Sequence, residues 1–203
     1  MSNLSIRKPM QKRSIEKKIK IIKAGLDLFC KKGFYNTNTV EIAKTAGVST
    51  GTVYSYFKDK EDIYIASFKY FLDSYLRPLL NELESLPKPV DTHVLVDKCI
   101  DLFINLYVNS RQTVNELGLM QQSNPEIMQQ FAAYEDMILS ALVKACDNPN
   151  VAKKNLSEKM YLLYTLADIL GQEHAFHYHK NIDLEVLRRQ ITTMITYLFT
   201  ENQ

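Results

Sequence analysis

The chain has 203 residues, of which 46% are hydrophobic and 24% charged, so its composition is that of an ordinary globular protein rather than a disordered or fibrous one. No stretch reaches the ~18 apolar residues of a membrane-spanning helix and the N-terminal residues lack the apolar core of a signal peptide, which predicts a cytoplasmic protein without membrane contact. Residues 1–60 hold 13 Lys and Arg against four Asp and Glu, whereas residues 61–203 hold 12 against 19, and such a basic head indicates a polyanionic partner.

Apolar residues recur at spacings of three and four, and strand-like alternation is absent, which predicts an all-α fold. The Pro87-Lys88-Pro89 segment is the clearest break between helices, because two prolines flanking one residue disfavour a continuing helix. The expected helices cover about residues 15–32, 40–45, 50–57, 60–86, 92–109, 111–122, 125–146, 157–178 and 183–200.

The first helices carry clear start and stop signals. Gly33 is expected to end the first helix in a left-handed conformation, and Gly47 to form the turn after the second. Asn38 and Ser49 are the expected N-caps of the second and third helices. Two short capped helices joined by a tight turn have the length of a helix-turn-helix, in which the second helix enters the major groove of DNA.

The residues of this segment suit contact with DNA. Short polar side chains and tyrosine hydroxyls can meet base edges and phosphates, a glycine lets the helix approach closely, and lysines follow where the DNA backbone would pass. The helix starting near Val40 adds unpaired amides that favour a phosphate. Phe57 is expected in the core, whereas Tyr54 fits either role. The predicted DNA-binding residues are Thr39, Ser49, Thr50, Gly51, Thr52, Tyr54, Ser55, Tyr56, Lys58 and Lys60.

Five motifs in this region resemble the DNA-binding domain of the tetracycline-repressor (TetR) family. They are Ile22-Lys-Ala-Gly-Leu-Asp-Leu-Phe29, Lys32-Gly-Phe34, Thr39-Val-Glu-Ile-Ala-Lys-Thr-Ala-Gly-Val-Ser49, Gly51-Thr-Val-Tyr-Ser-Tyr-Phe57 and Lys60-Glu61. The resemblance implies a three-helix head, a helical body that dimerises through its last two long helices, and repression relieved by a small molecule. By the same resemblance, Thr39, Thr50, Gly51, Thr52, Tyr54, Tyr56 and Lys60 occupy positions that commonly touch DNA. Gly25 departs from the family, in which Ala is usual, and is expected to loosen the first helix slightly.

These observations predict two domains. Residues 1–60 form a helix-turn-helix DNA-binding domain with a basic N-terminal arm, and residues 61–203 form a larger helical domain for effector binding and dimerisation. Each of the last two helices has an apolar face, and these faces either pair across a dimer or pack into their own protomer. The predicted interface residues are Leu166, Leu170, Leu187, Ile191, Met194 and Leu198.

The body is rich in aromatic and Met side chains, which line apolar ligand pockets but also fill ordinary cores. The predicted effector-binding residues are Phe103, Tyr107, Met120, Phe131, Tyr134, Tyr161 and Tyr164. Glu116, Asp168 and Glu173 lie in partly apolar helical stretches, where each is either a buried partner for a cationic ligand or part of a solvated face.

Metal binding has little support in the sequence. His174, His177 and His179 cluster near the end of a helix, where the helix dipole favours imidazoles, and no third ligand at suitable spacing accompanies the first two. The cysteines Cys30, Cys99 and Cys146 lie far apart without a Cys-x-x-Cys pair, and all are expected to be buried. We predict neither a metal nor a cofactor.

The sequence therefore predicts a homodimeric, ligand-responsive transcriptional repressor that binds a palindromic double-stranded DNA operator. An alternative is an architectural or cell-division factor that uses the same head without a small-molecule switch. An enzyme is not expected, because the chain has no Gly-rich phosphate loop, no Ser-His-Asp arrangement with its usual context and no paired carboxylates in a recognisable frame.

Overall fold

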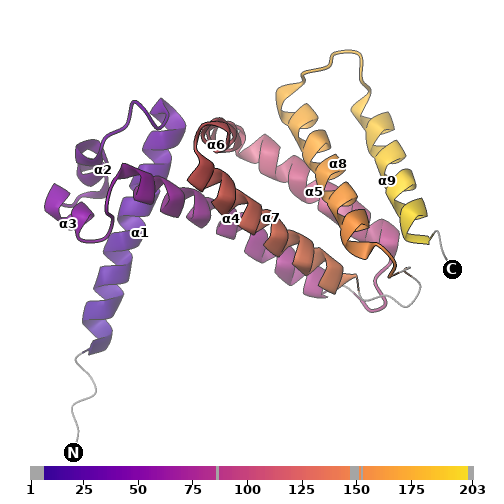
Figure 1. The fold of residues 1–203 in the computed structure, drawn as a ribbon, viewed down its shortest axis with the longest axis horizontal. Helices are drawn as coiled ribbons and strands as arrows, with labels where there is room; N and C mark the ends of the chain where they lie inside the picture. Colours follow the sequence, from indigo (N-terminus) through magenta and orange to yellow (C-terminus); the bar gives the residue numbers. More distant parts are fainter. Residues whose placement is uncertain (1–6, 86, 147–150, 152, 201–203) are drawn as a thin grey trace, which may run out of the picture. The chain divides into compact units, whose positions relative to one another are not determined.

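The structure is a computed structural model that describes residues 7–85, 87–146, 151 and 153–200. Within these residues the chain is all-helical, which confirms the predicted fold class (Figure 1). The helices are α1 (Arg7–Lys32), α2 (Thr39–Ala46), α3 (Thr50–Tyr54), α4 (Lys60–Ser85), α5 (Thr92–Asn109), α6 (Arg111–Ser123), α7 (Pro125–Ala145), α8 (Leu156–Phe176) and α9 (Leu184–Thr200). None of the helices in the described ranges is long and apolar enough to cross a membrane.

Two helix boundaries differ from the prediction by more than end fraying. Helix α1 begins at Arg7 rather than near residue 15, so the basic N-terminal segment extends the helix instead of preceding it. Helix α3 ends at Tyr54 rather than at Phe57. The chain then continues as a turn that places Phe57 in the core, with 3% of its surface exposed, as predicted for this side chain.

Contacts divide the chain into two compact units. Unit 1 contains the chain up to Ser74 together with Asn115–Ile127, and unit 2 contains Tyr75–Val114 together with the chain from Met128 onward. Helices α4, α6 and α7 therefore each contribute to both units. The predicted boundary at residue 60, which rested on sequence motifs, stays a prediction about the DNA-binding domain.

Unit 1 is held together by an apolar core under α1, α2 and α3. Ile21, Ile42 and Val53, one from each helix, are fully or almost fully buried. Aromatic rings extend this core, with the Tyr64 ring centroid 5.0 Å from Phe29. Burial of this kind, rather than helix propensity, stabilises such short helices, because isolated helices of this length are marginal in water.

Gly25 has a packing reason that the sequence did not reveal. A Cβ added there would lie 2.8 Å from Cγ2 of Ile63 and 3.0 Å from Oγ of Ser67, both on α4. The Ser67 hydroxyl donates to the carbonyl of Ile22 at 3.0 Å, which ties α4 to α1 at the same place. The glycine therefore allows a close approach of two helices, and the expected loosening of α1 is only part of its effect.

Unit 2 is built on α5, α8 and α9, which pack side by side (Figure 1). Their facing side chains form one buried cluster that includes Ile100, Leu163 and Ile195. At Gly171 the backbones of α5 and α8 approach closely, because an added Cβ would lie 2.8 Å from the carbonyl oxygen of Phe103.

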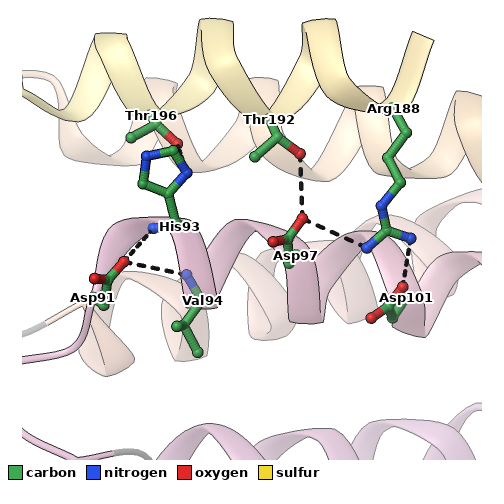
Figure 2. A network of polar contacts seen from close by, with 8 residues as sticks. All are labelled: Asp91, His93, Val94, Asp97, Asp101, Arg188, Thr192 and Thr196. Carbon is green, nitrogen blue, oxygen red and sulfur yellow. Dashed lines mark hydrogen bonds and ion pairs between the residues drawn. The ribbon is translucent and has the colours of Figure 1, made fainter. Parts of the chain in front are cut away.

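A polar network joins α5 to α9 along one side of unit 2 (Figure 2). The Arg188 guanidinium donates to Oδ1 of Asp101 at 2.6 Å and to Oδ1 of Asp97 at 3.5 Å. The Thr192 hydroxyl donates to the same Asp97 oxygen at 3.3 Å. These polar contacts link α9 to α5 in addition to the apolar core.

None of the three cysteines, all of which lie in the described part of the chain, forms a disulfide. Cys99 and Cys146 are buried as predicted, and burial raises the pKa of Cys99 to about 12. The prediction is wrong for Cys30, which is only half-buried, because its position on α1 lies at the edge of the core.

Candidate nucleic-acid interface

The turn between α2 and α3 has the predicted capping geometry. The Asn38 side chain accepts a hydrogen bond from the Glu41 amide at 2.9 Å, which caps α2. Gly47 has φ of 69°, and its N–H closes the end of the helix on the carbonyls of Ala43 and Lys44. A residue with a side chain is strained in this left-handed conformation, so the tight turn depends on glycine.

Helix α3 is capped by Ser49. Its hydroxyl accepts from the Thr52 amide at 3.1 Å and lies 2.9 Å from the Thr52 hydroxyl. An α3 Cβ at Gly51 would meet only Ser49 Oγ at 3.9 Å, so this face of the helix is open. Ser49, Thr52 and Gly51 therefore lie together on a surface that another molecule can approach.

Tyr54 shows that the polar face and the core are on opposite sides of α3. Val53 is fully buried, whereas Tyr54 is 54% exposed. The Tyr54 hydroxyl lies 3.1 Å from the Thr39 hydroxyl, so these two predicted DNA contacts, one from α3 and one from α2, are adjacent. Of the two roles left open for Tyr54, exposure favours the surface role.

The residues that follow α3 extend this surface. The Ser55 hydroxyl donates to the Thr52 carbonyl at 2.6 Å, and the Tyr56 hydroxyl lies 3.0 Å from the hydroxyl of Ser14 on α1. The side chain of Lys58 is 90% exposed. Thr50 is half-buried at the start of the helix. The structure thus pairs Thr39 with Tyr54, and Thr52 with Ser49 and Ser55, whereas the Tyr56 hydroxyl contacts α1.

Lys60 has a different role within unit 1. Its ammonium donates to the carbonyls of Phe34 at 2.7 Å and Thr37 at 2.8 Å, and it lies 4.2 Å from the centroid of the Phe34 ring. Partial burial lowers its pKa. The contacts of the Lys60 ammonium with described residues all hold the loop between α1 and α2, so Lys60 supports the site, and its contact with DNA stays a prediction.

Glu116 supports the same loop, which its position in the sequence did not indicate. Its carboxylate accepts from the Phe34 amide at 2.8 Å, although the two residues are 82 positions apart. The Tyr64 hydroxyl donates to the Glu116 carbonyl at 3.2 Å. Burial raises the pKa of Glu116, and the bond from Phe34 opposes that shift. No pattern of neighbouring residues in the sequence predicts the contact between Glu116 and Phe34.

The candidate effector-binding residues are divided between the two units. Met120 belongs to unit 1 and the others to unit 2, where Tyr161 is 53% exposed on α8. Phe103 and Tyr164 are buried in unit 2, with ring centroids 5.1 Å apart. Phe131, Tyr134 and Tyr107 are half-buried in the same unit.

Two carboxylates accompany these rings. The Tyr107 hydroxyl donates to Oδ1 of Asp168 at 2.6 Å, and Gln172 donates to Oδ2 at 2.7 Å. The Tyr164 hydroxyl donates to Glu135 at 3.0 Å. Burial is the main reason that the pKa of each carboxyl is raised. Asp168 is therefore not on a solvated face.

Glu173 is also buried, with 5% of its surface exposed. Its carboxylate accepts from Nδ1 of His179 at 2.5 Å. Nδ1 of His174 lies 2.9 Å from the Leu170 carbonyl, and His177 ends α8 with φ of 51°. Among the described residues no group of three metal-ligating side chains is found. His174 and His179 instead make hydrogen bonds with Leu170 and Glu173 of α8.

The residues predicted for the dimer face differ in how exposed they are, and their role in a dimer stays a prediction. Leu170 is fully buried and Ile191 is 3% exposed, because both point into the core of their own protomer. Met194 is 48% exposed, and Leu166, Leu187 and Leu198 are half-buried beside the core. The large apolar and aromatic residues that α8 and α9 leave at the surface are Tyr161, Leu162, Ile169, Met194 and Tyr197.

The geometry of α2, the Gly47 turn and α3 is that of a helix-turn-helix DNA-binding domain. Residues 21–66 match the family model of bacterial regulatory proteins of the tetR family. HbdR, an HTH-type transcriptional regulator of Aromatoleum sp. (strain CIB), is 41% identical over 76 residues, which cover 37% of this chain and 33% of HbdR. The chain thus aligns with about a third of that relative. The match to the tetR family lies in the N-terminal part of the chain, at residues 21–66.

Solved structures extend the similarity in fold to most of the chain. A chain from Mesorhizobium loti MAFF303099, described as a TetR-family transcriptional regulator, has a TM-score of 0.71 at 18% identity and covers 92% of this chain and 96% of its own. A transcriptional regulator from Saccharomonospora viridis in complex with choline has a TM-score of 0.66 at 17% identity, covering 88% of this chain and 94% of its own. At these identities the likeness concerns the fold.

Proposed function

We propose that this protein is a transcription regulator that binds a palindromic DNA operator and represses transcription until a small effector releases it. The observation that carries the proposal is the exposed polar face of α3, which has Ser49, Thr52 and Tyr54 at its surface and Val53 in the core. This is the face that a recognition helix presents to the major groove.

The test is in vitro selection of bound duplexes from a random pool, followed by titration of the selected sequence with variants. The double variant Thr52→Ala, Tyr54→Phe removes two hydroxyls from α3, and we expect specific affinity to fall about 10- to 100-fold, since each lost hydrogen bond costs about 0.5–1.5 kcal/mol. The matched control is Thr193→Ala, Tyr178→Phe, which removes two exposed hydroxyls from unit 2. Undiminished affinity of the α3 variant, or no selected sequence for the wild type, would contradict the proposal.

We propose that the regulator acts as a homodimer through the exposed apolar face of α8 and α9. Leu162 and Ile169 are seven residues apart on α8, with 45% and 46% of their surfaces exposed, and Met194 on α9 is similarly exposed. Contiguous apolar surface of this kind marks protein interfaces. Ile169→Asp should shift the sedimentation equilibrium toward monomer and weaken operator binding, whereas Met128→Asp, at an exposed position on α7, should do neither.

The effector site is proposed among the aromatic rings and carboxylates of unit 2. Asp168 and Glu135 have hydrogen-bond donors but no ion pair within the described residues, so a cationic effector would supply the missing charge. The structural neighbour bound to choline holds a cation of this kind. We expect amines and quaternary ammonium compounds to raise the thermal midpoint more than isosteric alcohols, and Asp168→Asn to remove the difference. Equal shifts for charged and neutral compounds would exclude a cationic effector.

Genome-wide mapping of bound DNA distinguishes the alternative. A few palindromic promoter sites support a local regulator, whereas many dispersed sites that persist under all growth conditions favour an architectural factor.

A further inference from the structure

The positive charge of unit 1 is not on its recognition helix. Helix α3, with the sequence TGTVY, carries no charged side chain. Of the 13 basic residues among the first sixty, ten lie within α1 (Arg7–Lys32). Attraction to phosphate is the main source of sequence-independent affinity for DNA. In this protein that attraction must therefore come mostly from α1.

Only part of this charge is available to a partner. The two lysines at the end of α1 form ion pairs with nearby carboxylates, and two in its middle lie over aromatic rings of unit 1. By contrast, Arg13, Lys17 and Lys20 are exposed and make no hydrogen bond or ion pair with any residue that the structure describes. They are free to meet an external anion.

These three side chains form a row on one flank of α1. Their spacings of four and three residues place them on the same face of the helix. The row is next to the turn that follows α3, because Ser14 contacts the Tyr56 hydroxyl at 3.0 Å and Lys18 lies 5.5 Å from the Phe57 ring centroid. In the sequence, Arg13 directly precedes Ser14, and Lys17 directly precedes Lys18.

We infer that the Arg13, Lys17 and Lys20 row is a second DNA contact, which binds phosphates beside the groove that α3 enters. This inference rests on the proposed DNA-binding function and adds a surface to it. The row supplies affinity without reading bases, whereas the hydroxyls of α3 read bases without supplying charge. The longer α1 that the structure shows keeps the row helical and in register beside Tyr56.

The experiment measures the salt dependence of binding to a labelled duplex of arbitrary sequence and to a duplex selected by the wild type. The variant is Arg13→Gln, Lys17→Gln, Lys20→Gln, and the charge-matched control is Lys153→Gln, Lys154→Gln, Lys180→Gln, at exposed positions of unit 2. Each neutralised phosphate contributes about 0.9 to the slope of log affinity against log salt, so the variant should lose about 2.7 per bound protomer on both duplexes. The control should keep the wild-type slope, and Arg13→Lys, Lys17→Arg, Lys20→Arg should retain it.

The outcomes separate this inference from the proposed function. If the variant and the control have the same slope while the wild type still selects a specific sequence, the row is not a DNA contact and the proposed function stands. If the wild type selects no sequence but the variant alone loses slope, the row binds phosphate and the operator proposal fails. A loss of slope with retained preference for the selected duplex supports both.

Discussion

The turn between α2 and α3 in unit 1 and the interior of unit 2 differ in how far apart in the sequence their polar partners lie. In unit 1 the caps join neighbours, since Asn38 bonds the amide of Glu41 and Ser49 bonds that of Thr52. In unit 2 the partners come from different helices, and Tyr107 and Asp168 are 61 residues apart. Local patterns therefore define the surface of unit 1, whereas packing between helices defines the interior of unit 2.

The strongest test of this difference is at Gly171. Replacing Gly171 with Ala would place a Cβ 2.8 Å from the Phe103 carbonyl oxygen, and backbone cannot move aside as a side-chain tip can. We expect the free energy of unfolding to fall by about 2–3 kcal/mol, the upper range for overpacking. Urea denaturation measures it.

Gly118 provides the matched control for that variant. It is also within a helix, but an added Cβ would meet nothing within 4 Å. Gly118→Ala should leave stability unchanged or raise it by up to about 1 kcal/mol through helix propensity. Equal effects of the two substitutions would show that the close approach of α5 and α8 is unimportant for stability.

A smaller effect concerns Lys60, which makes one of the non-local contacts of unit 1. Lys60→Ala leaves the carbonyls of Phe34 and Thr37 without a charged donor, and we expect a loss of about 2 kcal/mol, within the range for hydrogen bonds to charged groups. Lys58→Ala removes an exposed lysine that is not held in this way, and its stability should change by less than about 0.5 kcal/mol.

The variants Lys58→Ala and Lys60→Ala also distinguish a residue that supports the loop from one that contacts DNA. Lys58→Ala should lower DNA affinity without lowering the thermal midpoint, whereas the loss of affinity in Lys60→Ala should follow its loss of folded protein. A Lys60→Ala protein that is fully stable but binds DNA weakly would restore Lys60 to the DNA-contacting residues.

Sequence reasoning succeeded where the physical signal is short-range. The caps at Asn38 and Ser49, the left-handed Gly47 and the break at Pro87-Lys88-Pro89 were all predictable, because each depends on a few adjacent residues. Periodicity located the helices but not their orientation within the bundle. It identified an apolar face that includes Leu170, but not that this side chain points into its own core.

Most of what the sequence did not predict depends on contacts between residues that are far apart in the chain. Glu116 anchors the Phe34 amide from 82 residues away, and nothing near either residue indicates the pairing. Lys60 matched a DNA-contact position by resemblance, yet its ammonium is held by two carbonyls of a loop that only the folded chain brings near. A residue type at a motif position predicts a possible contact, and the surrounding packing decides whether its side chain is free to make it.

The next effect in size tests the network of unit 2 shown in Figure 2. Arg188→Gln removes the ion pairs from α9 to Asp97 and Asp101 on α5, which are partly exposed. We expect stability to fall by about 0.5–1 kcal/mol at low salt and by less at high salt, because exposed pairs are weak and screened. Arg189→Gln removes a neighbouring exposed charge as the control. A loss that does not change with salt would assign the role of Arg188 to packing.

The smallest expected effect is a difference in the sign of pH dependence between the units. Burial raises the pKa of Asp168 in unit 2, so the folded state binds more protons than the unfolded state above the ordinary Asp pKa of 3.8. Its contribution to stability is therefore largest at acidic pH and is lost as pH rises through the folded pKa. Asp168→Asn should reduce this decline, as followed by urea denaturation across a pH series.

Glu41 in unit 1 has the opposite behaviour. The hydrogen bond from Lys32 lowers its pKa, so its contribution is present above the ordinary Glu pKa of 4.5 and is lost as pH falls through the folded pKa. Glu41→Gln should therefore reduce stability at neutral pH and have no effect at the most acidic pH at which the protein folds. If both variants changed the pH profile in the same direction, the contrast between Glu41, which is held by an ion pair with Lys32, and Asp168, which is buried, would be wrong.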